Sequence, residues 1–178
     1  MKLRWSMVVA LGIVFAVCGP PAAATEPGFE RMKFKDYLLI LRDAHLARQK
    51  KQFERAFTLY QRNACGGDKA SQFALGSMYL LGEGTEPDAL RAYAWLKSAA
   101  EAKEPRYLKA VAALEAAIPD QHRTAAEAAA AEVISHYGLE ATHMTCLMRA
   151  EAGTRIAEQE CKPPVDIRNS MVEVKLCE

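Results

Sequence analysis

The chain lacks the features that would point to a membrane protein or to a nucleic-acid-binding protein. Its 178 residues carry 23 Lys and Arg against 22 Asp and Glu, a formal charge of +1, so no basic excess predicts nucleic acid as a partner. The longest mainly apolar run, residues 7–17, is shorter than the roughly 20 residues that a membrane-spanning helix needs. We therefore expect no integral membrane span and no nucleic-acid partner.

Common catalytic motifs are also absent. The sequence has no S-x-x-K, G-x-S-x-G, H-E-x-x-H or C-x-x-C pattern and no P-loop. His136, His143 and Cys146 lie close enough in sequence to bind a transition metal together, but a disulfide at Cys146 would remove that site. We expect no catalytic residue, no metal and no cofactor, and hence a protein that is not an enzyme.

The first 24 residues have the pattern of a secretory signal peptide. Lys2 and Arg4 precede the apolar run, and Ala22-Ala23-Ala24 fits the small-x-small rule for cleavage after Ala24. An alternative is lipid modification of Cys18, although a bulky Val17 stands where a small residue is usual. We expect export to the periplasm or beyond the cell, with residues 25–33 as a short polar leader.

Helical periodicity dominates the region from residue 34 to residue 138, which we expect to be the helical repeat domain. Apolar residues recur at spacings of three and four over residues 34–47, 52–64, 105–118 and 120–137. Pro105 fits the first turn of its helix, and Asp120 is placed to cap the last one. Residues 54–64 also superimpose on residues 90–100 after a shift of 36 positions, which indicates stacked helical hairpins. We expect six helices in three antiparallel pairs.

Residues 70–100 form one complete helix–turn–helix unit. Gly82 and Gly84 end its first helix, because glycine readily takes the left-handed conformation common at helix C-termini. Thr85 then fits the N-cap of the second helix, with Asp88 three residues further on. The first helix is apolar nearly all round, so we expect neighbours on every side of it.

Eleven positions of this unit resemble the Sel1-like repeat, a branch of the tetratricopeptide-like α-solenoids. They are Ala70, Leu75, Gly76, Tyr79, Gly82, Gly84, Asp88, Ala92, Trp95, Ala99 and Ala100. The best repeat spans residues 68–103 and departs from the pattern at Thr85, where Val is usual, and at Lys103, where Gly usually closes the unit. The resemblance implies a mainly α fold, a short α-solenoid, and a protein-binding scaffold without naming its partner.

The tail, residues 139–178, changes character and predicts a disulfide-linked β-hairpin. Gly153-Thr154 suits a two-residue hairpin turn, and that turn places Cys146 opposite Cys161 and Arg149 opposite Glu158. Directly opposed residues lie within disulfide reach, so we expect a Cys146–Cys161 bond. Cys65 and Cys177 remain as a second possible pair, in keeping with export to an oxidising compartment. The segment 169–177 fits a third strand or a short helix, and its alternating pattern favours the strand.

The repeat, Tyr137-Gly138 and the Cys-flanked hairpin are together similar to small exported proteins of Gram-negative bacteria. We therefore expect a non-catalytic interaction scaffold of the cell envelope whose partner is another envelope protein or a peptide. The alternatives are a protein that binds a small ligand such as a cell-wall fragment, and an enzyme with an unrecognised site. Gln72, Ser77 and Glu83, which point away from the apolar stripe of the repeat, are the expected binding residues.

Overall fold

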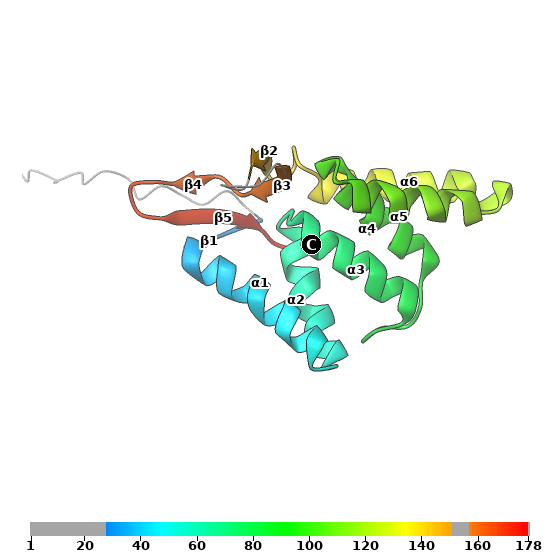
Figure 1. The fold of residues 1–178 in the computed structure, drawn as a ribbon, viewed down its shortest axis with the longest axis horizontal. Coiled ribbons are helices and arrows are strands. Elements are labelled where there is room, and N and C mark those ends of the chain that lie inside the picture. Colours follow the sequence, from blue (N-terminus) through cyan, green and yellow to red (C-terminus); the bar gives the residue numbers. More distant parts are fainter. Residues whose placement is uncertain (1–27, 151–156, 178) are drawn as a thin grey trace, which may run out of the picture.

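The computed structural model describes residues 28–150 and 157–177, and over these ranges it contains six α-helices, one 3₁₀ turn and five β-strands (Figure 1). In chain order they are β1 (Phe29–Lys33), α1 (Phe34–Gln49), α2 (Phe53–Cys65), α3 (Lys69–Leu81), α4 (Ala89–Ala99), η1 (Ala100–Ala102), α5 (Pro105–Ala117), α6 (Asp120–Tyr137), β2 (Thr145–Ala150), β3 (Ala157–Lys162), β4 (Val165–Asp166) and β5 (Met171–Lys175). The expected signal peptide, Cys18 and the expected turn at Gly153-Thr154 lie outside the described residues. Within the described ranges, no helix combines the length and the apolar character that crossing a membrane requires.

The six predicted helices are all present. Most of their ends lie within two residues of the predicted ones, and the largest difference is at the start of α4, which begins at Ala89 and not directly after Thr85. Consecutive helices from α1 to α4 pack against one another, and α5 and α6 then both pack against α4. Two of the three expected pairs, α1–α2 and α3–α4, are therefore present. In the third expected pair, α5–α6, the main partner of α6 is α4 and not α5. The third pair differs because α4 has a second apolar side, and α5 and α6 both pack their apolar side chains against it.

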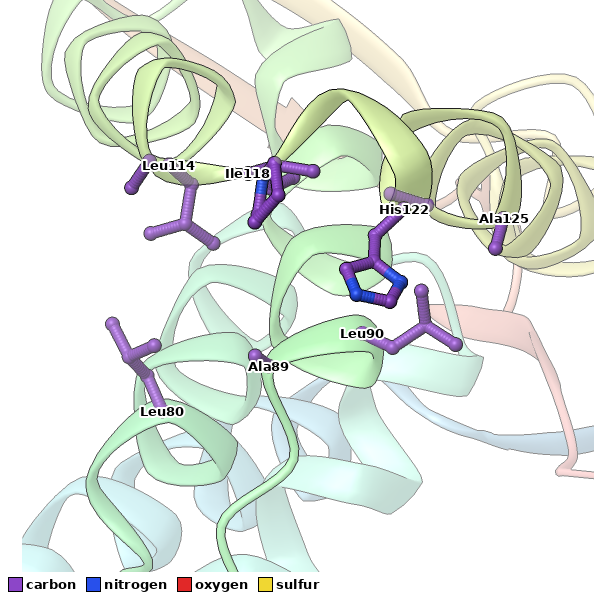
Figure 2. A pocket seen from close by; sticks show the side chains of 10 residues that line it. Leu80, Ala89, Leu90, Leu114, Ile118, His122 and Ala125 are labelled. Atoms are coloured by element: carbon purple, nitrogen blue, oxygen red, sulfur yellow. The ribbon is translucent and has the colours of Figure 1, made fainter.

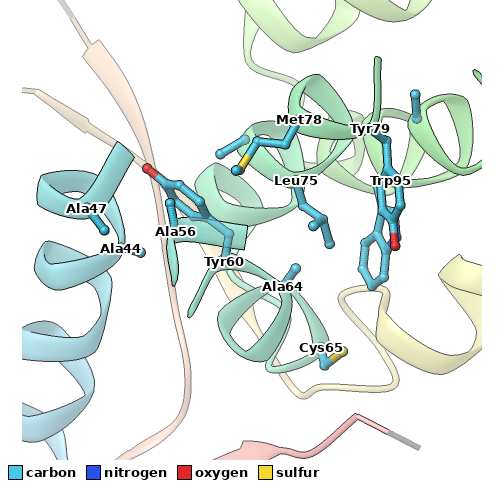
Figure 3. Close-up of a cluster of buried hydrophobic side chains, with 12 residues drawn as sticks. Ala44, Ala47, Ala56, Tyr60, Ala64, Cys65, Leu75, Met78, Tyr79 and Trp95 are labelled. Carbon is cyan, nitrogen blue, oxygen red and sulfur yellow. The ribbon is translucent and has the colours of Figure 1, made fainter. Parts of the chain in front are cut away.

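The larger core lies between α1, α2, α3 and α4 (Figure 3). Ala44 of α1 and Ala56 of α2 are fully buried in it, and such small side chains allow helix backbones to approach closely. Leu75 and Met78 fill its centre from α3. A second core joins α4 to α5 and α6 through Tyr93, Ala94, Leu96, Val111, Ala126 and Ala130.

The helix ends follow the predicted chemistry only in part. Gly82 ends α3 in the left-handed conformation, with a φ of 69°, as predicted. The predicted N-cap at Thr85 is wrong: the N-cap of α4 is Asp88, whose Oδ1 accepts the backbone N–H groups of Leu90 (3.0 Å) and Arg91 (2.9 Å). The predicted cap at Asp120 is also wrong, because Asp120 is already the first residue of α6 and its carboxylate pairs with Arg123 instead.

Lys103, which stands where the repeat usually has Gly, has a left-handed backbone with a φ of 59°. This conformation costs a residue with a Cβ about 1–2 kcal/mol, and glycine avoids that cost while losing more entropy on folding. We therefore expect Lys103→Gly to raise the free energy of unfolding by about 0.5–1 kcal/mol, measured by urea denaturation. Lys109→Gly, in the interior of α5, is the control and is expected to lower it by about 1 kcal/mol. A loss of stability in Lys103→Gly would contradict the prediction.

The expected leader, residues 25–33, contains a strand. β1 pairs antiparallel with β5, from Phe29 opposite Lys175 to Lys33 opposite Met171, and β4 pairs with the other side of β5. This three-stranded sheet packs on α1 through Val172, Val174 and Tyr37. The expected polar leader therefore includes the strand Phe29–Lys33, which was not predicted because its partner lies near the far end of the chain. The preference for a strand within residues 169–177 is confirmed by β5.

The hairpin has the predicted register. β2 and β3 pair with Cys146 opposite Cys161 and Arg149 opposite Glu158, although the side chains of Arg149 and Glu158 are outside the described ones. The structure joins Cys146 to Cys161, with 4.0 Å between their Cα atoms, and it joins Cys65 at the end of α2 to Cys177 after β5. The second bond, with β5, fastens the end of the chain to the first helical pair.

Candidate functional site

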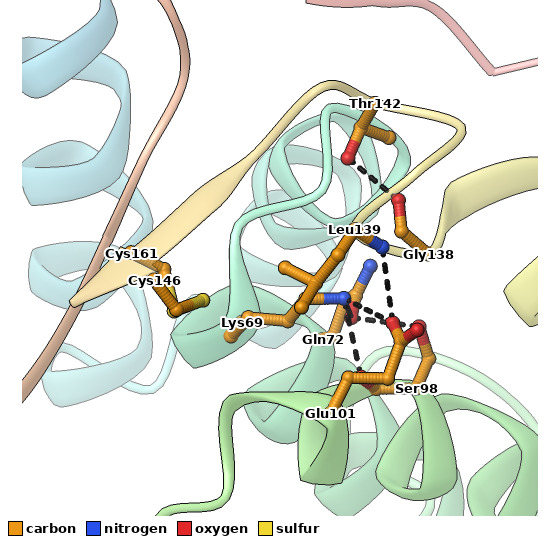
Figure 4. The surroundings of a disulfide bond; sticks show 9 residues. All are labelled: Lys69, Gln72, Ser98, Glu101, Gly138, Leu139, Thr142, Cys146 and Cys161. Carbon is orange, nitrogen blue, oxygen red and sulfur yellow. Dashed lines mark hydrogen bonds and ion pairs between the residues drawn. A yellow bond between two sulfur atoms is a disulfide. The ribbon is translucent and has the colours of Figure 1, made fainter.

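A buried polar cluster joins α3 to the segments around it, near the Cys146–Cys161 disulfide (Figure 4). The side chain of Lys69 is only 2% exposed, and its Nζ donates to Glu101 Oε2 (2.8 Å), Gln72 Oε1 (3.0 Å) and the Ser98 carbonyl (3.2 Å). Burial lowers the pKa of Lys69, and the hydrogen bond to Glu101 opposes that shift. Glu101 Oε2 also accepts the backbone N–H of Leu139 (3.1 Å), so the cluster holds the segment after α6 against α3 and α4. Each polar group finds its partner inside the protein, which marks the cluster as structural.

Gln72, one of the three expected binding residues, belongs to this cluster. Its side chain is fully buried, and its Nε2 donates to the carbonyls of Ala64 (3.0 Å) and Tyr137 (2.7 Å). The expectation that Gln72 meets a partner at the surface is therefore wrong: an amide with four internal partners stabilises the interior better than it serves an exposed face.

Ser77 and Glu83 are half-buried and have partners within the chain. Ser77 Oγ donates to the carbonyl of Phe73 (2.8 Å), and Glu83 Oε2 accepts from Arg48 Nε (2.8 Å). A binding role for Ser77 and Glu83 stays a prediction, and for Glu83 it would compete with an ion pair between α1 and the loop after α3.

An open apolar groove lies where the ends of four helices meet (Figure 2). It has a volume of about 430 Å³ and is lined by Leu80, Ala89, Leu90, Leu114, Ala117, Ile118, Pro119, His122, Ala125 and Ala126. Leu80 of α3 and Leu90 of α4 are each 44% exposed, and Leu81 is 63% exposed. The expectation that the first repeat helix has neighbours on every side is wrong at this end, because α5 and α6 pack on α4 and leave the end of α3 uncovered.

A charged cluster supports the α4–α5–α6 junction. The single hydroxyl hydrogen of Tyr93 in α4 is shared between two carboxylates, Glu127 of α6 (O···O 2.5 Å) and Glu115 of α5 (3.1 Å). Lys97 Nζ donates to Glu115 Oε1 (2.5 Å), which raises the pKa of Lys97 and lowers that of Glu115. Burial, followed by the bond to Glu127, raises the pKa of Tyr93 to about 12. These bonds fix the three helices that form one side of the groove.

The histidines and cysteines of the described part of the chain form no metal centre. No group of three or more His, Cys, Asp or Glu side chains in residues 28–150 and 157–177 has a metal-binding arrangement. Cys146 is bonded to Cys161, and His143 packs against the ring of Phe29 with 5.6 Å between ring centroids. His122 at the groove is a single imidazole among aliphatic side chains.

Residues 69–103 match the Sel1 repeat. The chain contains a Sel1 repeat. The crystal structure of c5321, a protective antigen present in uropathogenic Escherichia coli strains and displaying an SLR (Sel1-like repeat) fold, is similar, with a TM-score of 0.54 at 20% identity over 67% of this chain. The matched region covers 27% of that structure, so this chain spans about a quarter of its length and shares the fold of that part. No curated protein matches the sequence.

The Sel1 signature residues are mainly packing residues in the structure. Leu75, Tyr79, Ala92, Trp95 and Ala99 are all buried, whereas Ala70 is exposed. A Cβ on Gly76 would lie 3.0 Å from the carbonyl oxygen of Ala92, and one on Gly84 would lie 2.4 Å from that of Phe53. These two glycines therefore let α3 approach α4 and let the loop after α3 approach the start of α2.

The groove was missed at the sequence level, although one signal pointed to it. The run from Phe73 to Leu81 is apolar nearly all round, so any side left uncovered by neighbouring helices becomes an apolar surface. Finding that side required the positions of α5 and α6.

Proposed function

We propose that this chain is an exported, non-catalytic interaction scaffold of the bacterial cell envelope, and that its apolar groove receives an amphipathic helix of another envelope protein. The Sel1-like fold is a protein-interaction scaffold, and two disulfides indicate an extracytoplasmic location. The expected signal peptide with cleavage after Ala24 supports the periplasm as that location.

The observation that carries this proposal is the groove and its position in the solenoid. In a stack of helical hairpins each helix pair is covered by the next, and here the end of α3 has no such cover. Leu80 and Leu90 are presented together on the uncovered side, which suits the spaced apolar anchors of a helix lying in a groove. The ion pairs Arg91–Asp88 and Arg123–Asp120 lie beside groove residues in the sequence, and both charge signs are therefore available for polar residues of the partner helix.

Site-specific photocrosslinking in cells tests this proposal. A photoreactive phenylalanine analogue at Leu90 is expected to give one discrete adduct with an envelope protein, and Leu80→Glu is expected to reduce its yield about tenfold or more, because a charge in an apolar site costs several kcal/mol. The same analogue at Leu38 of α1, which is 47% exposed against 44% for Leu90, is the matched control and should give no adduct. Equal labelling from both positions, or an adduct that Leu80→Glu leaves unchanged, would refute groove binding.

The volume of the groove also favours a second candidate function, the binding of a small ligand. About 430 Å³ falls within the usual range for ligand sites, and the aliphatic lining suits an apolar molecule better than a cell-wall saccharide. A thermal shift of the purified protein with a medium-chain fatty acid, abolished by Leu80→Glu, would support this function. No shift with the fatty acid, together with the photocrosslinked adduct, would support the scaffold.

A further inference from the structure

The hairpin β2–β3 has two edges of different character. β3 carries Glu158, Glu160 and Lys162 and is followed by Pro163-Pro164, and charges and prolines are common means of blocking strand edges. β2 carries one charged residue, Arg149, together with Leu147 and Met148, which are 67% and 63% exposed. In Figure 1 the strand β2 lies at the top of the molecule. With one charge and no adjacent proline, β2 is therefore the less protected and the more apolar of the two strands.

The register determines which backbone groups of β2 point outward. The Cα atoms of Cys146 and Cys161 are 4.0 Å apart, which is the short spacing of a pair that exchanges no hydrogen bonds. The N–H and C=O groups of Cys146 and, by alternation, Met148 then point away from β3. In the described part of the chain, none of the backbone bonds outside the helices and sheets reaches these groups.

We propose that the outer edge of β2 pairs with β2 of a second copy of this chain and forms a continuous four-stranded antiparallel sheet. An antiparallel strand edge is complementary to itself, because a two-fold axis brings outward donors opposite outward acceptors. With the axis at Leu147, the outward groups of Cys146 meet those of Met148 in the partner. The same register sets the two Leu147 side chains side by side at a closely spaced pair, which removes both from water.

The disulfide and the packing of the hairpin prepare this edge for pairing. A two-stranded hairpin alone is marginally stable in water, whereas this one is closed by Cys146–Cys161 and packs against Ala99, Ala102 and Tyr107. The edge is therefore held in extended conformation before association. The contact is small, so the dimer is expected to be weak, with a dissociation constant between about 1 μM and 1 mM.

Sedimentation velocity of the oxidised protein over a range of concentrations tests this proposal. We expect a monomer–dimer equilibrium that Met148→Pro weakens by about tenfold or more, because each copy loses an outward N–H that the hairpin itself does not use. Gln159→Pro, at the residue opposite Met148 in β3, removes an outward N–H from the other edge and should leave the dimer unchanged. Far-ultraviolet circular dichroism and thiol titration check that both variants are folded and oxidised.

Slower hydrogen exchange of the Cys146 and Met148 amides at high protein concentration is the second expected result. A protein that stays monomeric up to about 1 mM overturns the proposal. A dimer that Met148→Pro leaves intact, or that Leu90→Glu in the groove abolishes, also overturns it. The groove and the strand edge are tested by different variants, so either proposal can fail alone.

Discussion

Removal of the Cys65–Cys177 disulfide is expected to lower the free energy of unfolding by about 4–5 kcal/mol. The bond closes a loop of 112 residues, and a crosslink over a loop of this length restricts the unfolded chain strongly. A domain of this size is stable by only about 5–15 kcal/mol, so the loss is a large share of the total. Urea denaturation of Cys65→Ala/Cys177→Ala against the oxidised wild type measures it.

The second disulfide is the control for this prediction. Cys146 and Cys161 are 15 residues apart, and Cys146→Ala/Cys161→Ala is expected to lose about 3 kcal/mol, less than the first pair loses. Because Cys65 is buried and its replacement also removes packing, the reduced wild type serves as a second reference. An equal or smaller loss from the Cys65–Cys177 pair would contradict the loop-entropy explanation.

The parts of the fold that local sequence signals specify could be predicted. Helical spacing located all six helices, and the Gly153-Thr154 pair between two cysteines predicted the register of β2 and β3, which the structure confirms. These signals succeed because the partners of each helical turn or hairpin residue lie close by in the sequence. The N-cap prediction for α4 was wrong even though its signal is local. Both Thr85 and Asp88 can cap a helix, and only the backbone path decides which side chain reaches the helix amides.

The non-local features could not be predicted. Phe29–Lys33 pairs with Met171–Lys175, and no local pattern in FERMK distinguishes an edge strand from a polar leader. The groove depends on α6 packing on α4 instead of continuing the stack, which is a property of two apolar surfaces and not of a motif. The prediction that Gln72 binds a partner was wrong for a similar reason. A polar residue on the outer face of one helix becomes internal when the segment after α6 covers it.

Glu101→Gln is expected to destabilise the protein by about 2–4 kcal/mol at neutral pH. This loss is somewhat smaller than that for a fully enclosed ion pair, because the Glu101 side chain is 26% exposed. The substitution keeps the shape and an acceptor for the Leu139 N–H, but it leaves the buried ammonium of Lys69 without its carboxylate. Asp120→Asn, which removes a carboxylate that is 96% exposed and paired with Arg123, is the matched control and should change stability by less than about 0.5 kcal/mol.

The pH dependence of this loss separates electrostatics from packing. Burial already lowers the pKa of Lys69, and loss of the Glu101 charge lowers it further. Lys69 then has a lower pKa in the folded variant than in the folded wild type, and at pH values between these two the folded variant binds fewer protons. The stability of the variant therefore rises more steeply with pH than that of the wild type. The deficit should therefore shrink toward alkaline pH, measured by urea denaturation at several pH values, and Lys69→Met/Glu101→Gln should recover most of it at neutral pH. A deficit that stays constant with pH would show that Glu101 acts through its shape and not through the charge that it places beside Lys69.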